Sequence, residues 1–308
     1  MTGSEFVNTY SRRTLGAWEA AALDLARQGQ LTPWPFVDVT VTDGNDTAVL
    51  GVQSDVLAIG PLNDRLRLPL TPGVAQSIAN LTGALLPTPW LEYAIWRSAP
   101  VKLDPTAMVP NQGANLEQYA AHSRLIDEEL AARAALPGTL VAGIKKGVVV
   151  ANFYKPGKVL LFGWYRPAPP APDVFDDGKP MGAVGRQPVQ PKSNVHGDFY
   201  VDYSHGIRLI APACVVNGQR METAALYQHP TLSKLVNPDA TSGPTQRGPI
   251  RVPRYPASVP PAPVRVAFGP SVLGPASQTV VSRQGRVLFT PDPTEIALDE
   301  ISRRRRGE

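Results

Sequence analysis

The sequence is poor in cysteine, in charge and in long apolar runs, and each shortage excludes a class of protein. The single cysteine, Cys214, rules out an internal disulfide framework and any cysteine-rich zinc module. No apolar run reaches the roughly 18 residues that span a bilayer, so we expect no membrane span. The segment MTGSEFVNTYSRR lacks a basic start followed by an apolar stretch, which predicts synthesis in the cytoplasm without a signal peptide.

Standard catalytic motifs are missing too. The chain has neither the G-x-S-x-G turn of α/β-hydrolases nor an H-E-x-x-H zinc helix. Charged residues make up only 18% of the 308 positions, the net charge is +4, and the one basic cluster is the arginine run at 303–306. Four arginines without interleaved aromatic residues neutralise few phosphates, so the pattern does not favour a nucleic acid partner. The run is typical of a basic helix end, with an electrostatic tail for an acidic surface as the alternative.

Proline and glycine are abundant, with 33 and 26 residues, beside 43% apolar residues. This composition predicts a buried core with many short strands and ordered loops rather than a helical bundle. We therefore expect an α+β fold with mixed strands and helices in the N-terminal part and a β-rich second half, followed by a Pro-rich C-terminal arm with a small hairpin-plus-helix element.

Periodicity and turn residues predict where these elements fall. The Asp43-Gly44-Asn45-Asp46 run is a hairpin turn, and Thr-Pro pairs at 71–72 and 88–89 are helix starts. Helices are predicted at 14–27, 71–83, 90–98, 115–134 and 231–236. Strands are predicted at 36–41, 48–52, 56–59, 66–70, 140–151, 159–165 and 199–216.

Three parts are expected: a main α+β domain at 1–237, an extended arm at 238–278, and a hairpin and helix with a basic end at 279–308. The arm is rich in proline, which predicts that it lies extended over the main domain or a partner chain and supports an oligomer. Val264, Val266 and Phe268 alternate and could add a strand to a sheet edge. A second Pro-rich stretch, at 167–191, predicts a functional loop or a partner-binding lid.

The densest polar run, 196–208, lies in the long predicted strand 199–216. Alternation in a strand would place His196, Asp198, Tyr200, Asp202 and Ser204 on one face, and Phe199, Val201 and Tyr203 on the other, toward a core. Burying such a polar face costs several kcal/mol unless every group is paired. The face is therefore either solvated or functional.

The spacing of residues along a strand limits which of these side chains can act together. Residues two apart in a strand lie about 6.6 Å apart, which makes Asp202 and Ser204 neighbours. Gly206 permits a bend that brings His205 to the same face. We therefore select His205, Asp202 and Ser204 as candidate catalytic residues.

Three chemistries remain open for this region, beside a purely structural hydrogen-bond network. In acid–base hydrolysis, His205 is the base, Asp202 orients it, and Ser204 is the nucleophile or a substrate contact. In metal-assisted hydrolysis, His196 and Asp198 bind zinc or another divalent ion together with a distant histidine, His122 or His205. In a binding site, the carboxylates and the aromatic rings of Trp164 and Tyr165 hold a hydroxyl-rich ligand.

Residues outside the run complete the candidate site. The Lys145-Lys146 pair interrupts an apolar stretch, so one of the two lysines must point inward or into a cleft. A lysine in a cleft could hold an anionic substrate group, whereas an edge-strand lysine that blocks aggregation is the alternative. The candidate substrate-binding residues are Lys145, Trp164, Tyr203 and His122.

Five segments of the chain, 200–209, 55–60, 69–72, 142–146 and 162–165, fall within residues 50–240. Together they resemble a group of uncharacterised proteins of bacteria and their phages. The resemblance implies no activity, because none is established for the group. In those proteins the glycine matching Gly143 is followed by histidine, whereas this chain has Ile144.

Together these features favour a hydrolase, of bacterial or phage origin, that acts on a cell-envelope polymer such as peptidoglycan or polysaccharide. The alternative is a non-catalytic virion or assembly protein whose arm binds neighbouring subunits. A shared cleft containing His122, Lys145 and His205 would favour the enzyme, because catalytic groups must meet at hydrogen-bond range.

Overall fold

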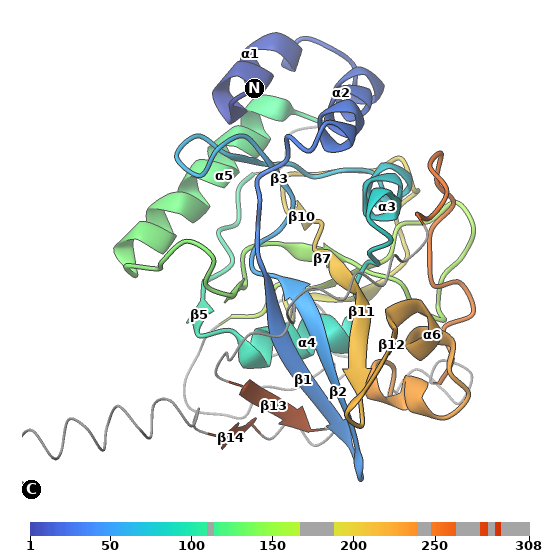
Figure 1. The fold of residues 1–308 in the computed structure, drawn as a ribbon. Coiled ribbons are helices and arrows are strands. Elements are labelled where there is room, and N and C mark those ends of the chain that lie inside the picture. The colour runs from blue at the N-terminus through green and yellow to red at the C-terminus, as the bar shows by residue number, and fades with distance from the viewer. Residues whose placement is uncertain (110–113, 167–187, 239–247, 263–277, 283–286, 291–308) are drawn as a thin grey trace, which may run out of the picture.

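The computed structural model describes residues 1–109, 114–166, 188–238, 248–262, 278–282 and 287–290. Within these ranges the chain has the expected mixed α+β architecture, with helices arranged around several small sheets (Figure 1). No helix of the described part is both long and apolar enough to cross a membrane.

The largest sheet has the strand order β12-β11-β2-β1-β13-β14 (Figure 1). Its strands are β1 (Phe36–Asp43), β2 (Asp46–Gln53), β11 (Ile210–Val216), β12 (Gln219–Glu222), β13 (Gln278–Ser282) and β14 (Val287–Thr290). The pairs β1–β2, β2–β11, β11–β12 and β13–β14 are antiparallel, whereas β13 joins β1 in parallel. The predicted C-terminal hairpin is thus confirmed, and it extends the sheet of the main domain.

The β1–β2 hairpin forms as its turn predicts. The pairing runs without interruption from Phe36 opposite Gln53 to Asp43 opposite Asp46. Gly44 in the turn has a φ of 63°, which a glycine adopts without the strain that a Cβ would cause.

A second sheet positions the candidate site and has the order β10-β7-β8-β9. Its strands are β7 (Lys146–Val148), β8 (Leu161–Gly163), β9 (Gln190–Ser193) and β10 (His205–Gly206). Two further pairs are β3 (Ala58–Ile59) with β4 (Leu66–Arg67), and β5 (Val101–Lys102) with β6 (Val141–Ala142). The predicted strands at 140–151 and 159–165 are therefore shorter than expected, and the first is divided between two sheets.

Most predicted helices are confirmed, with cap residues at their starts. The helices are α1 (Gly3–Tyr10), α2 (Leu15–Arg27), α3 (Pro72–Leu81), α4 (Pro89–Ser98), α5 (Leu116–Ala132), α6 (Thr223–Gln228) and the 3₁₀ helix η1 (Leu232–Leu235). Thr14, Thr88 and Asn115 each accept a backbone N–H bond as N-caps. Thr71 makes no such bond, and its own N–H donates instead to Glu19.

The prediction misses two helices. α1 begins with a capping box, in which Thr2 and Glu5 each satisfy a backbone N–H of the other. This threonine-to-glutamate spacing was a readable signal in the sequence. The other missed helix, α6, spans only six residues and has no side-chain cap.

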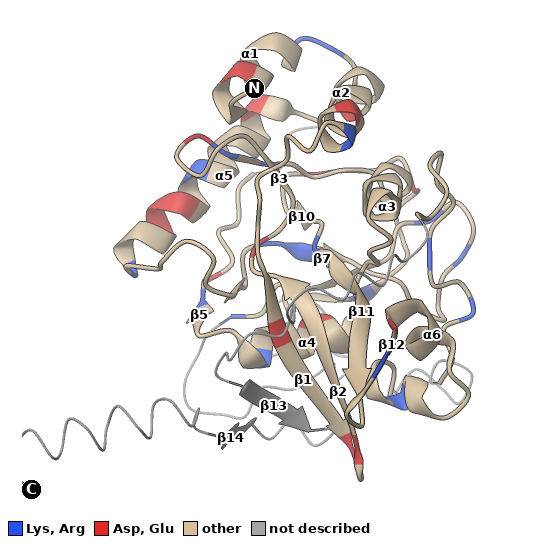
Figure 2. Cartoon of the chain, viewed as in Figure 1, with Lys and Arg blue, Asp and Glu red and all other residues tan. Residues whose placement is uncertain are grey.

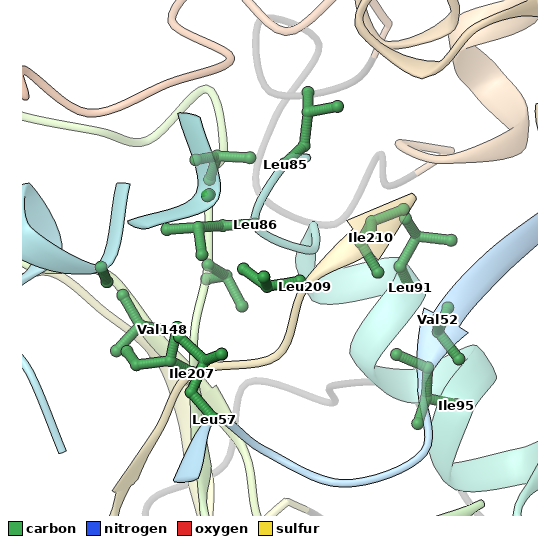
Figure 3. Packing of buried hydrophobic residues seen from close by; sticks show 14 of the residues in the cluster. Val52, Leu57, Leu85, Leu86, Leu91, Ile95, Val148, Ile207, Leu209 and Ile210 are labelled. Carbon is green, nitrogen blue, oxygen red and sulfur yellow. The ribbon is translucent and has the colours of Figure 1, made fainter. Parts of the chain in front are cut away.

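One apolar core joins the helices to the large sheet. In Figure 3, Leu91 and Ile95 of α4 lie beside Ile210 of β11 and Val52 of β2. Cys214 of β11 is a buried member of the same cluster, and burial raises the pKa of its thiol to about 11. Cys214 therefore acts as a small core residue.

The long strand predicted at 199–216 is wrong in its first half. Turns and irregular backbone occupy 197–204, β10 covers two residues, and a regular strand starts only at Ile210. Phe199, predicted to face the core, is 77% exposed, whereas Val201 and Tyr203 are buried. The cause is a local side-chain-to-backbone bond, described below, that competes with the strand.

Residues 248–262, the longest described stretch of the predicted arm, contain no helix or strand and run beside α3 (Figure 1). Arg254 donates to Asn80 and to the carbonyl of Ala84, at 2.6 and 2.7 Å. Ile250 and Tyr255 are buried in the core cluster, so this segment supplies core residues as well as covering the surface. The Tyr255 hydroxyl donates to the Val149 carbonyl at 2.7 Å.

Some predicted features lie outside the described residues. They are most of the Pro-rich loop at 167–191, the alternating residues Val264, Val266 and Phe268, the helix predicted at the end of 279–308 and the arginine run at 303–306.

Candidate functional site

Parallel pairing of β10 with β7 brings two distant segments together at the candidate site. His205 lies opposite Lys146, and Gly206 lies opposite Gly147. A Cβ at Gly206 would lie 2.7 Å from the Cβ of Lys145, closer than carbon atoms tolerate. Gly206 is therefore required for this close approach, beside any role in bending the chain.

Lys145 is the lysine that points inward, as the sequence required of one of the pair. Its side chain is only 6% exposed. The ammonium Nζ donates to Nδ1 of His122 at 3.0 Å and to the Tyr203 carbonyl. Burial lowers the pKa of Lys145 to about 7, and the positive charge of Arg67 adds to this effect. At neutral pH this amine therefore exists in both charged and neutral forms.

His122, on α5, is held as a neutral imidazole. Its Nε2 lies 3.0 Å from the Thr106 carbonyl, which only accepts, so Nε2 carries the proton and Nδ1 receives the lysine bond. Burial, reinforced by Lys145, lowers the pKa of His122 to about 2. The ring packs edge-on against Tyr203 and Trp164, with centroids at 4.9 and 6.3 Å. The four candidate substrate-binding residues thus lie together, but all four are buried, and His122 is buried completely.

Asp202, Ser204 and His205 form a tight turn instead of a strand face. One carboxylate oxygen of Asp202, Oδ1, accepts from the Ser204 backbone N–H at 2.7 Å and from the Ser204 hydroxyl. The His205 N–H donates to the Asp202 carbonyl at 3.2 Å. These local bonds satisfy the backbone inside the turn, which explains why the predicted strand is interrupted here.

The other carboxylate oxygen, Oδ2 of Asp202, lies 3.8 Å from Nε2 of His205 and accepts from the Tyr200 hydroxyl at 3.2 Å. Although burial raises the pKa of Asp202, the His205 ring and the Ser204 donors together hold it below its usual range. Asp202 is thus an anion at neutral pH, directed at the imidazole.

His205 is fully buried, and neither ring nitrogen has a hydrogen-bond partner among the described residues. Burial lowers its pKa to about 4, despite the opposing charge of Asp202. The ring is therefore a neutral base at neutral pH. The Ser204 hydroxyl donates to Asp202, so in this arrangement Ser204 holds the carboxylate and is not hydrogen-bonded to His205.

Partly exposed residues lie between His205 and the surface. The Tyr200 ring has its centroid 5.7 Å from that of His205 and stacks on exposed His196 at 4.0 Å. The Lys146 ammonium lies 5.5 Å from the centroid of the Trp164 ring. The Asp202 side chain is 17% exposed, which marks this side as the approach to the turn.

A metal site is not assembled by the residues predicted for it. His196 and Asp198 are both exposed. Within the described part of the chain, no three His, Cys, Asp or Glu residues are grouped so that they could hold a metal ion. The zinc hypothesis therefore has no supporting geometry among these residues.

Sequence reasoning missed a second buried polar cluster behind the site, here called the Arg67 network: Arg67, Asp55, Asp127 and Ser123. The Arg67 guanidinium is fully buried and donates to Asp55 at 2.7 Å and to Asp127 at 2.7 Å. The Ser123 hydroxyl accepts from the Arg67 N–H at 3.1 Å. A charged residue inside a short apolar strand was the available signal. Figure 2 shows how few charged residues lie among the strands, with one basic residue, Lys146, on β7.

Comparisons of the chain with protein-family models, with curated proteins and with solved structures find no match in any of the three.

Proposed function

We propose that this protein is a hydrolase in which His205 is the general base and Asp202 orients it. The observation that carries the proposal is the fully buried imidazole of His205, without a hydrogen-bond partner among the described residues, 3.8 Å from a carboxylate that three donors fix in place. An unsatisfied buried polar group costs about 1–3 kcal/mol, so its retention suggests a functional use.

The geometry suggests how the base would act. Asp202 faces Nε2, which favours the tautomer with its proton on Nε2 and leaves Nδ1 free to accept a proton from water. The imidazolium formed would be stabilised by the same carboxylate. Because the pKa of His205 is about 4, the neutral form needed of a base prevails at neutral pH.

The position of Lys145 supports the proposal that this cluster is an active site. Lys145 reaches His122 and Tyr203 from the strand segment that pairs with β10, so His122, Lys145 and His205 belong to one connected cluster. We propose a cell-envelope polymer as the substrate, whose anionic groups would meet Lys146 beside the turn. A substrate would have to displace the Tyr200 ring to reach His205, which is fully buried.

The test is a turbidity assay on purified cell walls, with release of soluble fragments as a second measurement. We expect His205→Phe to abolish activity with little change in melting temperature, and His229→Gln, at the end of α6, to keep full activity. Activity that survives in His205→Phe would contradict the assignment of the base. Absence of activity in the parent protein on peptidoglycan and polysaccharide would contradict the substrate class.

A non-catalytic assembly protein is the second candidate, favoured by one observation. β13 adds in parallel to β1, and the hairpin it belongs to is the C-terminal part of the sheet. The same strand addition between chains would link neighbouring subunits. Light scattering of the full chain and of a chain ending after residue 262 tests this candidate: the same number of subunits in both particles would contradict it.

A further inference from the structure

A cavity of about 490 Å³ lies between α1, the loop that joins β3 to β4, and α5. Helix α5 packs against both α1 and β4, and Figure 1 shows α1 beside α5. A volume of this size is typical of small-ligand sites, which range over about 300–1,000 Å³. Arg124 lines the cavity, whereas His122 on the same helix contacts Lys145, and the two positions are about 200° apart around the helix axis. The cavity is therefore separate from the candidate site.

Hydrogen bonds hold the start of α1 against the loop. The carbonyl of Asp64 accepts from the Gly3 N–H at 2.8 Å, and the Asp64 carboxylate Oδ1 accepts from the N–H and the hydroxyl of Ser4 at 3.0 and 2.9 Å. A Cβ at Gly3 would come within 2.7 Å of the Leu66 backbone nitrogen, so this close approach requires glycine. The walls of the cavity are thus fixed without a ligand, which lowers the entropy cost of binding one.

Asp127 of α5 contributes an acceptor to the lining. Its Oδ1 accepts from the guanidinium groups of both Arg65 and Arg67, the second at 2.7 Å. None of the described residues donates to its other oxygen, Oδ2, and 33% of the side chain is exposed. Because two arginines hold the carboxylate in one orientation, Oδ2 keeps its capacity to accept a hydrogen bond from a ligand.

Three exposed side chains complete the polar lining: Arg124 of α5, Asn8 of α1 and Asn63 of the loop. None of them makes a hydrogen bond or an ion pair within the described part of the chain. A guanidinium only donates, whereas a carboxamide both donates and accepts. Since the three side chains belong to three different elements, one ligand in the cavity can meet all of them.

The charges of the lining balance. Arg65 and Arg124 are its two cations, and Asp64 and Asp127 are its two anions. An ion of either sign therefore gains no net attraction from the lining. A hydroxyl group donates and accepts at the same time, so a ligand with several hydroxyl groups matches this mixture of donors and acceptors.

We propose that the cavity binds a neutral, hydroxyl-rich ligand of the saccharide class. Arg124 and the two asparagines contact its hydroxyl groups, and Asp127 accepts from one of them. The partly buried side chain of Val7 provides an apolar contact for a sugar C–H face. This site does not rest on the role proposed for His205, because none of its residues belongs to the turn at 202–205.

Heteronuclear NMR of the full-length protein tests the ligand class, with maltotriose, cellotriose and chitotriose as the probes. We expect at least one of these neutral saccharides to shift the backbone amide signals of Ser4, Asn8 and Arg124. Failure of all three to bind would overturn the proposal, as would shifts confined to the turn at 202–205. Tighter binding of succinate or of glycine betaine than of every saccharide would also overturn it, because the site would then select an anion or a zwitterion.

Titration calorimetry of two variants tests the contacts with the saccharide that binds. We expect Arg124→Met to weaken binding about tenfold or more, because it removes a charged donor, and Asn8→Ala to weaken it about fivefold. Both side chains are exposed and unpaired among the described residues, so the melting temperature should stay the same. Arg133→Met, at the C-terminal end of α5 and outside the cavity, is the matched control and should bind as the parent does. Unchanged affinity in Arg124→Met, or an equal loss in Arg133→Met, would overturn the proposal.

Discussion

Two polar clusters act on the buried Lys145 and differ in how completely they are paired. In the Arg67 network, the guanidinium donates to two carboxylates and to Ser123. In the turn at 202–205, Asp202 is satisfied by three donors, yet the His205 ring beside it has no partner among the described residues. A complete network stabilises a fold, whereas an incomplete one costs stability and calls for a functional reason.

Breaking the Arg67 network should have the largest effect on the free energy of unfolding. Arg67→Met would leave Asp55 buried without its cation, and we expect a loss of about 3–5 kcal/mol in the free energy of unfolding. Urea unfolding measures it. The exposed control Arg27→Met, which breaks the pair with Asp24, should cost less than about 1 kcal/mol. Similar losses for both variants would contradict the distinction between the two clusters.

Lowering the pH should reduce the free energy of unfolding, because His205 in the incompletely paired cluster has a lowered pKa. The pKa of His205 is lowered from 6.5 to about 4 by burial, so between these values the unfolded chain binds a proton that the folded chain does not. Stability is therefore full above about pH 6.5 and falls as the pH drops toward 4, by about 2 kcal/mol at about pH 5 from this one group. Urea unfolding at about pH 7 and about pH 5 measures the fall. This fall in the free energy of unfolding should be smaller in His205→Phe, and the part that remains should come from other groups such as His122.

Removing one of the hydrogen bonds that Asp202 accepts should have a moderate effect on the free energy of unfolding. Ser204→Ala deletes the hydroxyl bond but keeps the backbone bond to the same oxygen, so we expect a loss of about 1 kcal/mol. The pKa of Asp202 should rise, which a carboxyl-resolved NMR titration can follow. If Ser204 were an activated nucleophile instead, the variant would lose all activity rather than part of it.

The smallest effect on stability is expected at His205 itself. His205→Phe replaces an unpaired buried imidazole with an apolar ring of similar shape, so the free energy of unfolding should change by less than about 1 kcal/mol or increase. A loss as large as that of Arg67→Met would show that His205 is paired in solution, and the contrast between the two clusters would fail.

Helix caps and turns could be predicted from the sequence because they depend only on residues a few positions apart. The caps at Thr14, Thr88 and Asn115 and the turn at Gly44 lie where the sequence predicts them, because each depends on neighbours a few residues away. The grouping of Asp202, Ser204 and His205 was predictable for the same reason. The strand that was expected to carry them was not, since the Asx-type bonds of Asp202 compete with extended backbone.

Pairing between distant segments was decided only by the tertiary structure. The sequence required one inward lysine at 145–146, but only the fold shows that Lys145 meets His122, which is 23 residues away, and that β7 pairs with β10. Arg67 and Tyr255 gave no local signal of their partners, Asp55 and the Val149 carbonyl, because burial and pairing depend on what the rest of the chain brings to them. The sequence by itself thus determined the starts of α2, α4 and α5 and the two hairpins; tertiary packing decided which polar groups are satisfied and which remain free for chemistry.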